Sequence, residues 1–253
     1  MADKPDSNAV VVIPARYESS RFPGKALAPI AGRAMIERVY EQAKKAKKIA
    51  RVVIATDDER IVEAVKSFGG EAMMTRKDHH CGTERVAEVA AHISAAIYVN
   101  VQGDEPLIDP EAIDTLVGAM EEDSEIQIAT PCAQIRQPAE IMDPNVVKAV
   151  ADFDENALYF SRAPIPWVRD TGAKVASHHW KHIGLYAFRH EALLDFPTLP
   201  PGDLERVEQL EQLRWLENGY KIRIVESEYD AVSVDVPGDV AKAEKILLER
   251  GLS

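Results

Sequence analysis

Three positively charged side chains lie close together near the start of the chain. Residues 14–25 read PARYESSRFPGK and contain Arg16, Arg21 and Lys25 but only one acidic residue, Glu18. The chain as a whole is acidic, with 30 Lys and Arg against 42 Asp and Glu and a formal net charge of −12. An arginine can bind phosphate oxygens through paired N–H groups, and a lysine acts as a point charge. This local excess of positive charge predicts a phosphate-binding loop, with a solvated basic loop as the alternative.

The same loop differs from two common phosphate-binding motifs. Its sequence matches neither G-x-G-x-x-G nor G-x-x-x-x-G-K-[ST]. The spacing therefore disfavours a Rossmann dinucleotide site and a Walker ATPase.

Two aspartates could hold a metal ion. Asp104 lies in the run QGDEP directly after an apolar segment, and Asp235 lies at a second expected strand end. Magnesium typically takes one or two carboxylates together with phosphate oxygens and water. Asp104 could instead simply start a turn before Pro106. Because the phosphate-binding loop is expected at the same edge of the sheet, we predict that Asp104 and Asp235 bind Mg²⁺.

Two further groups of residues suggest weaker sites. Residues 76–83 form a polar, glycine-containing loop that leads into a helix N-terminus, which can approach a base or a phosphate. Cys81 has no obvious base near it in sequence, so a nucleophilic cysteine is disfavoured. His178, His179 and His182 lack a matching set of carboxylates, so a zinc site is disfavoured.

Alternating strands and helices would position these loops. Residues 9–13 form a continuous β-branched run, typical of a strand buried on both faces. The expected strands are 9–13, 51–55, 72–75 and 97–101, and the expected helices are 35–47, 57–68 with Asp57 as N-cap, 83–94 and 110–120. This alternation predicts a doubly wound, mostly parallel α/β sheet, at whose carboxyl edge ligands bind.

The pattern changes after residue 125. Longer strands are expected at 126–135, 146–152 and 181–188, around a segment at 157–176 that is rich in Pro, Arg and aromatic residues. We interpret this part as a smaller antiparallel lobe or dimerisation arm. A helix at 205–218, a strand at 221–226 and a helix at 240–250 complete the chain.

Composition bounds the function further. A chain of 253 residues with 46% hydrophobic and 28% charged residues is typical of one globular domain. The negative charge argues against a broad nucleic-acid or anionic-membrane surface. The start of the chain does not resemble a secretory signal, and the apolar runs are too short for a membrane span. The two cysteines, Cys81 and Cys132, do not form a C-x-x-C motif, which is typical of a reducing compartment. We therefore expect a cytoplasmic protein without membrane insertion.

Five motifs in order resemble one enzyme family. They are Pro14-Ala15-Arg16 with Arg21-Phe22-Pro23-Gly24-Lys25, Gly82-Thr83-Glu84-Arg85, residues 99–106 (VNVQGDEP), residues 158–162 (LYFSR) and residues 182–186 (HIGLY). Together they resemble the 3-deoxy-manno-octulosonate (Kdo) cytidylyltransferases, also called CMP-Kdo synthetases, over residues 9–248. The resemblance implies a nucleotidyltransferase fold, one domain over 1–253 in which 126–200 form a sugar-binding and dimerisation lobe, and a homodimer.

The resemblance also implies site residues. For CTP they are Arg16, Arg21, Lys25, Arg76, Cys81, Gly82 and Asp104, of which Lys25, Arg16 and Asp104 would be catalytic, and Mg²⁺ would be held by Asp104 and Asp235. For the acid sugar they are Gln102, Arg162, His182, Tyr186, Glu211 and Gln212, with Arg162 facing the sugar carboxylate. Cys81 is a departure, because the family often has serine there.

The implied reaction is a Mg-dependent transfer of CMP from CTP to the anomeric hydroxyl of Kdo. It releases pyrophosphate and supplies CMP-Kdo for lipopolysaccharide biosynthesis. The acceptor could also be 8-amino-Kdo or a sialic acid. A sugar-1-phosphate nucleotidylyltransferase would have a first loop richer in glycine, and a non-catalytic CTP sensor would not need both aspartates.

Overall fold

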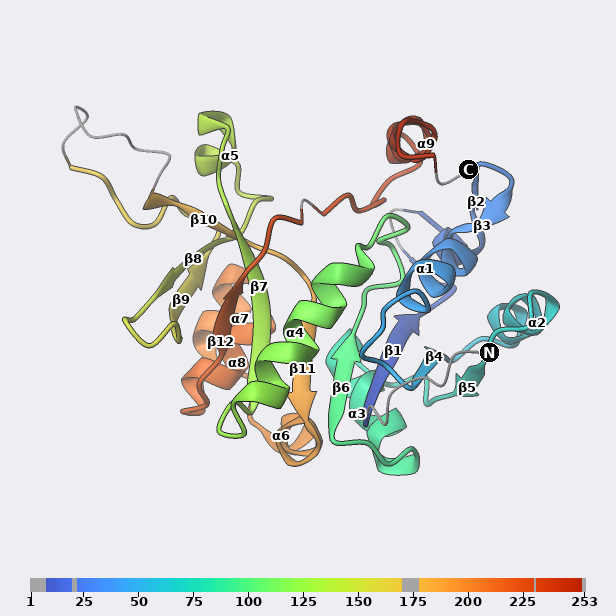
Figure 1. The fold of residues 1–253 in the computed structure, drawn as a ribbon, viewed down its shortest axis with the longest axis horizontal. Coiled ribbons are helices and arrows are strands. Elements are labelled where there is room, and N and C mark those ends of the chain that lie inside the picture. The colour runs from blue at the N-terminus through green and yellow to red at the C-terminus, as the bar shows by residue number, and fades with distance from the viewer. Residues whose placement is uncertain (1–7, 20–21, 170–177, 230, 252–253) are drawn as a thin grey trace.

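One mixed β-sheet runs through the protein (Figure 1). The computed structural model describes residues 8–19, 22–169, 178–229 and 231–251. Arg21 and residues 170–177 of the predicted arm lie outside these ranges. The strands of this sheet are β1 (Ala9–Ala15), β4 (Arg51–Thr56), β5 (Ala72–Met74), β6 (Ile97–Asn100), β7 (Ile128–Gln134), β8 (Lys148–Ala151), β9 (Ala157–Ser161), β10 (Trp180–His182), β11 (Tyr186–Arg189) and β12 (Arg223–Glu226). They pair in the order β5-β4-β1-β6-β11-β7-β10-β8-β9, and β12 pairs with β7.

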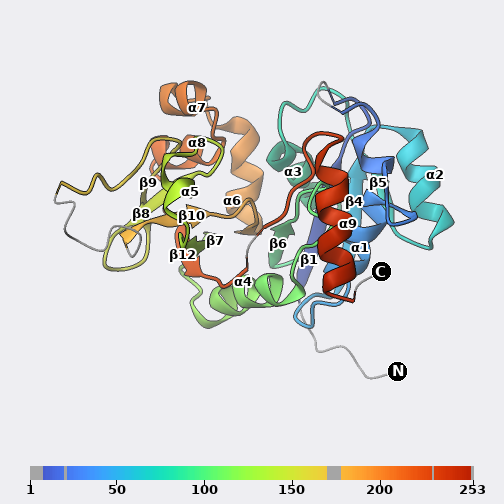
Figure 2. The same ribbon diagram turned by 90° about the horizontal axis from the view of Figure 1, so that it is seen from above.

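The first half of the sheet is parallel and is covered by helices on both faces (Figure 2). The helices are α1 (Met35–Ala43), α2 (Glu59–Ser67), α3 (Gly82–His92) and α4 (Pro110–Glu122). Val11 and Ile13 of β1 belong to the core that includes α1 and α4, whereas Val10 and Val12 belong to the core that includes α3. The prediction that this strand is buried on both faces is confirmed. The predicted α/β fold is confirmed with it.

The second half of the sheet is mainly antiparallel. Strand β11 pairs antiparallel with both β6 and β7, and β10, β8 and β9 continue the antiparallel pairing to the far edge. The helices of this half are α5 (Pro138–Met142), α6 (His190–Asp195), α7 (Asp203–Glu208) and α8 (Gln212–Glu217), with a 3-10 turn, η3, at Phe196–Thr198. The antiparallel strands therefore extend the parallel sheet, because β11 joins the two halves.

Two expected elements and one helix cap differ from the prediction. The expected strand at 181–188 is divided into β10, which pairs with β7 and β8, and β11, which pairs with β6 and β7. The expected helix at 205–218 is divided into α7 and α8, because Gln209 adopts a left-handed backbone conformation with φ 54°. The N-cap of α2 is Asp58, whose side chain accepts a hydrogen bond from the Arg60 amide, and not Asp57.

The chain crosses back over the sheet near its C-terminal end. After β12 it runs above the carboxyl ends of the parallel strands to α9 (Asp239–Glu249), as Figure 1 shows. Val234 in this crossing segment is fully buried among Ile30, Met35 and Leu247. Asp235 therefore lies in the crossing segment before α9, and the prediction of a strand end there was wrong. The crossing can still bring Asp235 to the same edge of the sheet as Asp104.

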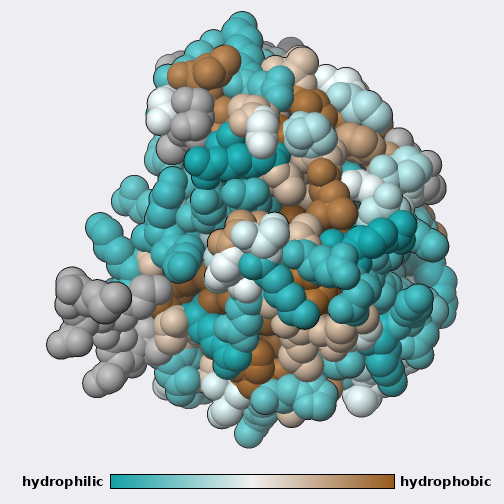
Figure 3. All heavy atoms as spheres, turned by 90° about the vertical axis from the view of Figure 1, so that its right-hand side faces the viewer, coloured by the Kyte–Doolittle hydropathy of each residue, from teal (hydrophilic) through white to brown (hydrophobic). Residues whose placement is uncertain are grey.

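The remaining elements lie beside the parallel half. They are the short hairpin β2 (Pro29–Ile30) and β3 (Arg33–Ala34), and the 3-10 turn η1 (Lys25–Leu27). The face of the molecule on this side is largely hydrophilic, with apolar atoms in small separate patches (Figure 3). In the described part of the chain, every helix is too short or too polar to span a bilayer.

Candidate functional site

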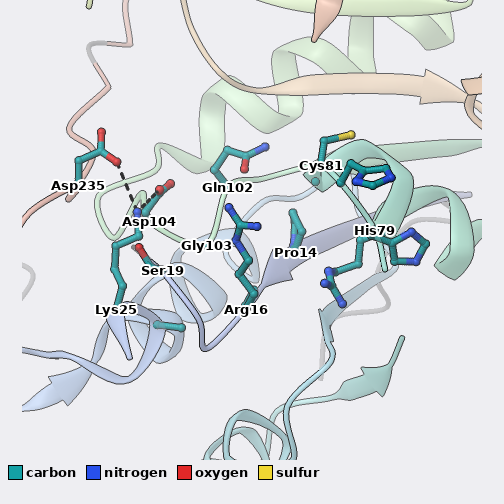
Figure 4. Close-up of a pocket in the computed structure, with 15 residues that line it drawn as sticks. Pro14, Arg16, Ser19, Lys25, His79, Cys81, Gln102, Gly103, Asp104 and Asp235 are labelled. Atoms are coloured by element: carbon teal, nitrogen blue, oxygen red, sulfur yellow. Dashed lines mark hydrogen bonds and ion pairs between the residues drawn. The ribbon is translucent and has the colours of Figure 1, made fainter. Parts of the chain in front are cut away.

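A polar cavity of about 270 Å³ lies at the carboxyl ends of β1 and β6 (Figure 4). This edge is where open α/β sheets bind ligands. Its lining residues come from three loops and the crossing segment: Pro14, Ala15, Arg16, Ser19, Lys25, Ala26, His79, His80, Cys81, Gly82, Arg85, Gln102, Gly103, Asp104 and Asp235. Arg16 and Lys25, two of the three loop cations predicted from the sequence, therefore meet both predicted aspartates in one cavity.

The loop after β1 is closed on itself, which places Lys25 at its end. The Gly24 amide donates to the Tyr17 carbonyl oxygen at 3.0 Å. Gly24 has φ +71°, a left-handed conformation that glycine adopts at little cost, and the Tyr17 ring packs where a side chain would begin. The Arg60 guanidinium lies over the same Tyr17 ring, 3.3 Å from its centre. These contacts turn the chain so that η1 starts at Lys25.

Lys25 lies between the two aspartates. Its Nζ donates to Asp104 Oδ2 at 2.6 Å and to Asp235 Oδ1 at 3.4 Å. The Val234 amide donates to the Asp104 carbonyl oxygen at 2.9 Å, which ties the crossing segment to the QGDEP turn. Two residues separated by 131 positions in sequence therefore present their carboxylates to one cation.

Gly103 lets the turn approach β1 closely. A Cβ atom at this position would lie 2.8 Å from the Pro14 carbonyl oxygen, closer than real Cβ contacts. A larger residue would push the QGDEP turn away from β1. The glycine therefore sets the position of Asp104 relative to the loop that carries Arg16.

The opposite wall is the loop before α3. The His79 ring is buried and hydrogen bonds to Glu88, and the His80 amide donates to Glu84 Oε2 at 2.7 Å. Arg85 lines the cavity, where its guanidinium binds Asp57 at 3.1 Å and hydrogen bonds to Thr75. Sequence reasoning missed Arg85 as a site residue, although it belongs to the Gly82-Thr83-Glu84-Arg85 motif.

Arg76 does not line this cavity. Its side chain is 68% exposed and its Nε lies 3.3 Å from Asp78 Oδ1. The assignment of Arg76 to CTP stays a prediction. Cys81 does line the cavity, and burial together with the neighbouring Glu211 carboxylate raises the pKa of its thiol. The thiol is therefore protonated near neutral pH and suited to packing rather than to nucleophilic attack.

A second cavity of about 460 Å³ adjoins the first, and Gln102 lines both. It lies between the QGDEP turn, β10, β11 and α8. Its lining residues are Gln102, Glu105, Glu140, Asn145, Val146, Val147, Lys181, His182, Ile183, Gly184, Tyr186, Leu210, Glu211, Gln212, Ala231 and Ser233. Five of the six residues predicted for the sugar are therefore brought together here.

Two buried polar groups in the second cavity have no hydrogen-bond partner among the described residues. They are the Tyr186 hydroxyl and the Gln212 Nε2 amide nitrogen. Burial raises the pKa of Tyr186 well above its usual value, so the hydroxyl keeps its proton. Buried polar groups are nearly always paired in native proteins. Two unpaired groups in one cavity indicate that it accommodates a polar ligand.

His182 is a neutral ring in the same cavity. Burial lowers its pKa to about 3. Its Nε2 lies 3.0 Å from the Thr130 hydroxyl, which itself lies 2.8 Å from the Leu185 carbonyl oxygen. Because the single Thr130 hydrogen is needed for that carbonyl, His182 Nε2 carries the ring proton. His182 Nδ1 is then a hydrogen-bond acceptor.

Glu105 is a buried carboxyl group that sequence reasoning did not assign to the site. It lies in the second cavity next to Asp104, and the Tyr229 hydroxyl lies 3.3 Å from its Oε2. Burial, together with the charge of Asp104, raises the pKa of Glu105 to about 8. Glu105 is therefore largely protonated at neutral pH and can donate a hydrogen bond.

Arg162 lies apart from the lining of the second cavity. Its Nε donates to the Glu208 carbonyl oxygen at 2.7 Å, and its terminal nitrogens donate to the Pro144 and Gln209 carbonyl oxygens at 2.9 and 3.3 Å. Its proposed role toward the sugar carboxylate stays a prediction. The cation in the cavity lining is Lys181, which also pairs with Glu140 at 2.8 Å. The sequence offered no signal for Lys181, because it fell inside an expected strand.

Sequence comparisons show which known proteins this chain resembles. The Cytidylyltransferase family model matches residues 10–222. Two relatives named 3-deoxy-manno-octulosonate cytidylyltransferase are similar over most of their length. The one from Solibacter usitatus is 52% identical and aligns over 93% of this chain and 92% of its own. The one from Syntrophotalea carbinolica is 53% identical over 95% and 98%.

Solved structures are also similar. The structure of a CMP:2-keto-3-deoxy-manno-octonic acid synthetase complexed with CTP has a TM-score of 0.91 and 43% identity, covering 96% of this chain and all 100% of that chain. A 4-diphosphocytidyl-2C-methyl-D-erythritol synthase from Anaerococcus prevotii, with a TM-score of 0.61 and 13% identity over 96% of this chain and 99% of its own, shares the fold alone.

Proposed function

The chain belongs to the family of 3-deoxy-manno-octulosonate cytidylyltransferases, and from this premise we propose how its two cavities carry out the transfer. The enzyme moves CMP from CTP to the anomeric hydroxyl of Kdo and releases pyrophosphate. We propose that the product, CMP-Kdo, serves lipopolysaccharide biosynthesis. The observation that carries the site assignment is the pair of adjoining cavities, one with cations and aspartates and one with unpaired polar groups.

The first cavity is proposed to bind CTP. Arg16 and Lys25 carry the charge that complements the phosphate chain, and Cys81 with Gly82 would approach the cytidine from the opposite wall. Arg21 and Arg76 remain candidates for the phosphates and the nucleoside, the first outside the described residues. The acidic background of the chain makes such a concentrated group of cations necessary for an anionic substrate.

Magnesium fits the aspartate pair. Lys25 Nζ, itself a cation, lies between Asp104 and Asp235 at 2.6 and 3.4 Å, so both carboxylates converge on a point where positive charge is stable. The described residues hold no cluster of three or more metal-binding side chains, and two carboxylates completed by phosphate oxygens and water suit magnesium. When bound, Mg²⁺ would neutralise phosphate charge and lower the pKa of the attacking hydroxyl.

The second cavity is proposed to bind the acid sugar. The Tyr186 hydroxyl and Gln212 amide would donate to it, and His182 Nδ1 would accept from one of its hydroxyls. Lys181 lies in the lining as a partner for the sugar carboxylate, and Arg162 remains the partner implied by family resemblance. Gln102 and Glu211 would line the same subsite, with Gln102 at the boundary between the two cavities.

The chemistry is then mainly one of positioning. The oxygen of the anomeric hydroxyl forms a bond to the α-phosphorus of CTP while the bond to pyrophosphate breaks in line with it. Arg16 and Lys25 stabilise the negative charge that grows on the leaving pyrophosphate. The shared boundary at Gln102 brings the hydroxyl and the α-phosphate together, which removes much of the entropic barrier of a two-substrate reaction.

Product analysis tests this function directly. Incubation with Mg²⁺, Kdo and each ribonucleoside triphosphate in turn should give a product of the mass of CMP-Kdo with CTP. The same assay with 8-amino-Kdo and with a sialic acid separates the alternative acceptors. Binding of CTP without any CMP-sugar product would instead identify a non-catalytic nucleotide sensor.

We expect Tyr186→Phe to weaken sugar binding without destabilising the protein. The Tyr186 hydroxyl makes no hydrogen bond to the described residues, so its removal leaves no partner unpaired. Loss of one hydrogen bond to the sugar, about 1 kcal/mol, should raise the KM for Kdo roughly fivefold. Steady-state kinetics and thermal unfolding measure the two effects.

Tyr220→Phe is the matched control. The Tyr220 hydroxyl donates to Asp195 Oδ2 at 2.6 Å, away from both cavities, so its loss should not affect the KM for Kdo. An unchanged KM in Tyr186→Phe would show that this hydroxyl does not contact the sugar.

We propose that the antiparallel half also forms a homodimer. An apolar cavity of about 530 Å³ lies on its outer face, lined in part by Pro166, Val168, Trp180 and Ile224, and Trp167 beside it is 76% exposed. The α2 side of the molecule is largely hydrophilic by contrast (Figure 3).

Light scattering should give twice the chain mass for the native protein and the single mass for Trp167→Asp. Leu248→Asp, at an exposed site on α9, should stay dimeric.

The domain boundaries and the setting of the protein remain predictions. The lobe at 126–200 is proposed to bind the sugar and the second copy, and the cytoplasmic location is proposed from the two free cysteines.

A further inference from the structure

Four polar side chains form a row between the two cavities. The row starts at Gln102, which lines both cavities, passes through Asn100 and Thr83, and ends at Glu211 in the second cavity. Asn100 is fully buried and Thr83 is 1% exposed. Thr83 lines neither cavity, so a direct contact with either substrate does not explain its hydroxyl.

The hydrogen bonds in this row all point the same way. Gln102 Nε2 donates to Asn100 Oδ1 at 3.2 Å, and Asn100 Nδ2 donates to Thr83 Oγ1 at 3.5 Å. The Thr83 hydroxyl then donates to Glu211 Oε1. Each internal residue both accepts and donates, so removal of one member leaves its neighbours with buried, unpaired groups.

The two ends of the Thr83–Glu211 hydrogen bond belong to different halves of the sheet. Thr83 lies in the first turn of α3, directly after Cys81 and Gly82 of the nucleotide cavity. Glu211 is the N-cap of α8, directly before Gln212 of the second cavity. Glu211 therefore links the α8 N-terminus to the start of α3, through the Thr83 hydroxyl and also through the Cys81 thiol, with which it interacts.

A second contact supports the same connection. The buried Arg214 guanidinium of α8 lies 2.6 Å from Glu205 of α7 and 3.6 Å from Glu84 of α3. Burial raises the pKa of Glu211, and the hydrogen bond from Thr83 acts in the opposite direction by favouring the carboxylate. Polar contacts between α3 and α8 therefore accompany the apolar core to which both helices contribute.

We propose that the Thr83–Glu211 hydrogen bond couples the two cavities, so that a ligand in one raises the affinity for a ligand in the other. This inference rests on the proposed function. A sugar that pairs with the Gln212 amide orders the α8 N-terminus, and the bond from Glu211 to Thr83 orders the turn at residues 81–83 against the nucleotide. The first ligand to bind then bears the entropic cost of ordering both segments, and the second ligand binds with higher affinity. The cooperativity is therefore positive, and it is the same whichever ligand binds first. Thr83 is a positioning residue in this arrangement.

Calorimetry with a non-reacting nucleotide tests the coupling. The probe is the α,β-methylene analogue of CTP, which cannot lose pyrophosphate, titrated with Mg²⁺ in the absence and presence of saturating Kdo. In the wild type we expect Kdo to tighten analogue binding by at least about fivefold, the lower end of typical allosteric coupling. In Thr83→Val, which removes the hydroxyl at nearly constant volume, that factor should fall to about one while each ligand alone still binds.

Control variants separate coupling from structural damage. Thr83→Ser keeps the hydroxyl and should keep the wild-type factor. If thermal unfolding shows that Thr83→Val does not fold, Thr83→Ala removes the same hydroxyl without the extra methyl group and repeats the test. A wild-type factor near one, or an unchanged factor in the hydroxyl-free variant, would overturn the coupling. Failure of the wild type to bind either ligand would instead refute the proposed function.

Discussion

Asp104→Ala should abolish pyrophosphate release from CTP and Kdo. Asp104 Oδ2 lies 2.6 Å from Lys25 Nζ in the first cavity and shares that cation with Asp235. A metal site with only two carboxylates cannot lose one and keep its ion in place. Charge stabilisation by a bound metal is worth several kcal/mol, so we expect turnover to fall by about 10³-fold or more. A coupled pyrophosphate assay at saturating CTP measures the loss.

Asp203→Ala is the matched control for Asp104→Ala. Asp203 is 93% exposed at the start of α7, its carboxylate pairs with Arg206 at 2.9 Å, and neither residue lines the two cavities. This variant should keep wild-type turnover if only the carboxylate proposed to bind the metal matters. Near-wild-type pyrophosphate release by Asp104→Ala would show that the metal assignment is wrong.

Lys25→Ala should slow turnover by roughly 10²-fold or more, the scale for losing one transition-state donor. The side chain is 17% exposed and lies where the phosphate chain is proposed to bind, so its charge acts in a partly dehydrated cavity. The same change removes the cation from between Asp104 and Asp235. We therefore also expect the nucleotide-free variant to bind Mg²⁺ more tightly than the wild type in a calorimetric titration.

The two readouts of Lys25→Ala test different roles. An unchanged kcat would exclude Lys25 from stabilising the leaving group. Unchanged Mg²⁺ binding would show that Lys25 does not compete with metal for the aspartates. Lys66→Ala, an exposed position on α2, should change neither quantity.

The parallel half of the fold could be predicted because its signals are local. Continuous β-branched runs such as residues 9–13, and helices whose apolar positions recur with helical spacing, bury the same faces in any tertiary context. The loop with Arg16 and Lys25 and the QGDEP turn with Asp104 follow those strands directly. Their meeting at one edge of the sheet is a consequence of parallel strand order.

The antiparallel half was less predictable, because its elements depend on their neighbours. The division of 181–188 into β10 and β11 reflects pairing with β8 in one case and β6 in the other. The helix expected at 205–218 is divided at Gln209, which adopts a left-handed backbone conformation. Glycine is the residue that usually signals such a conformation, so a glutamine there did not predict a helix end. The sequence predicted Asp57 as the N-cap of α2, but Asp58 provides the cap. The Asp57 carboxylate pairs instead with Arg85 of α3, a contact that the local sequence does not reveal.

The amino-acid sequence alone determined the fold class and the enzyme family, and it supplied the candidate side chains for phosphate and metal, because these depend on local patterns and motifs. Only the tertiary structure decided which side chains share a cavity. It brought Asp235 to Asp104 through the crossing segment, placed Lys181 and Glu105 in the lining of the cavity that Tyr186 also lines, and engaged the Arg162 guanidinium with backbone carbonyls. These placements depend on contacts between residues far apart in the chain, which composition and spacing do not encode.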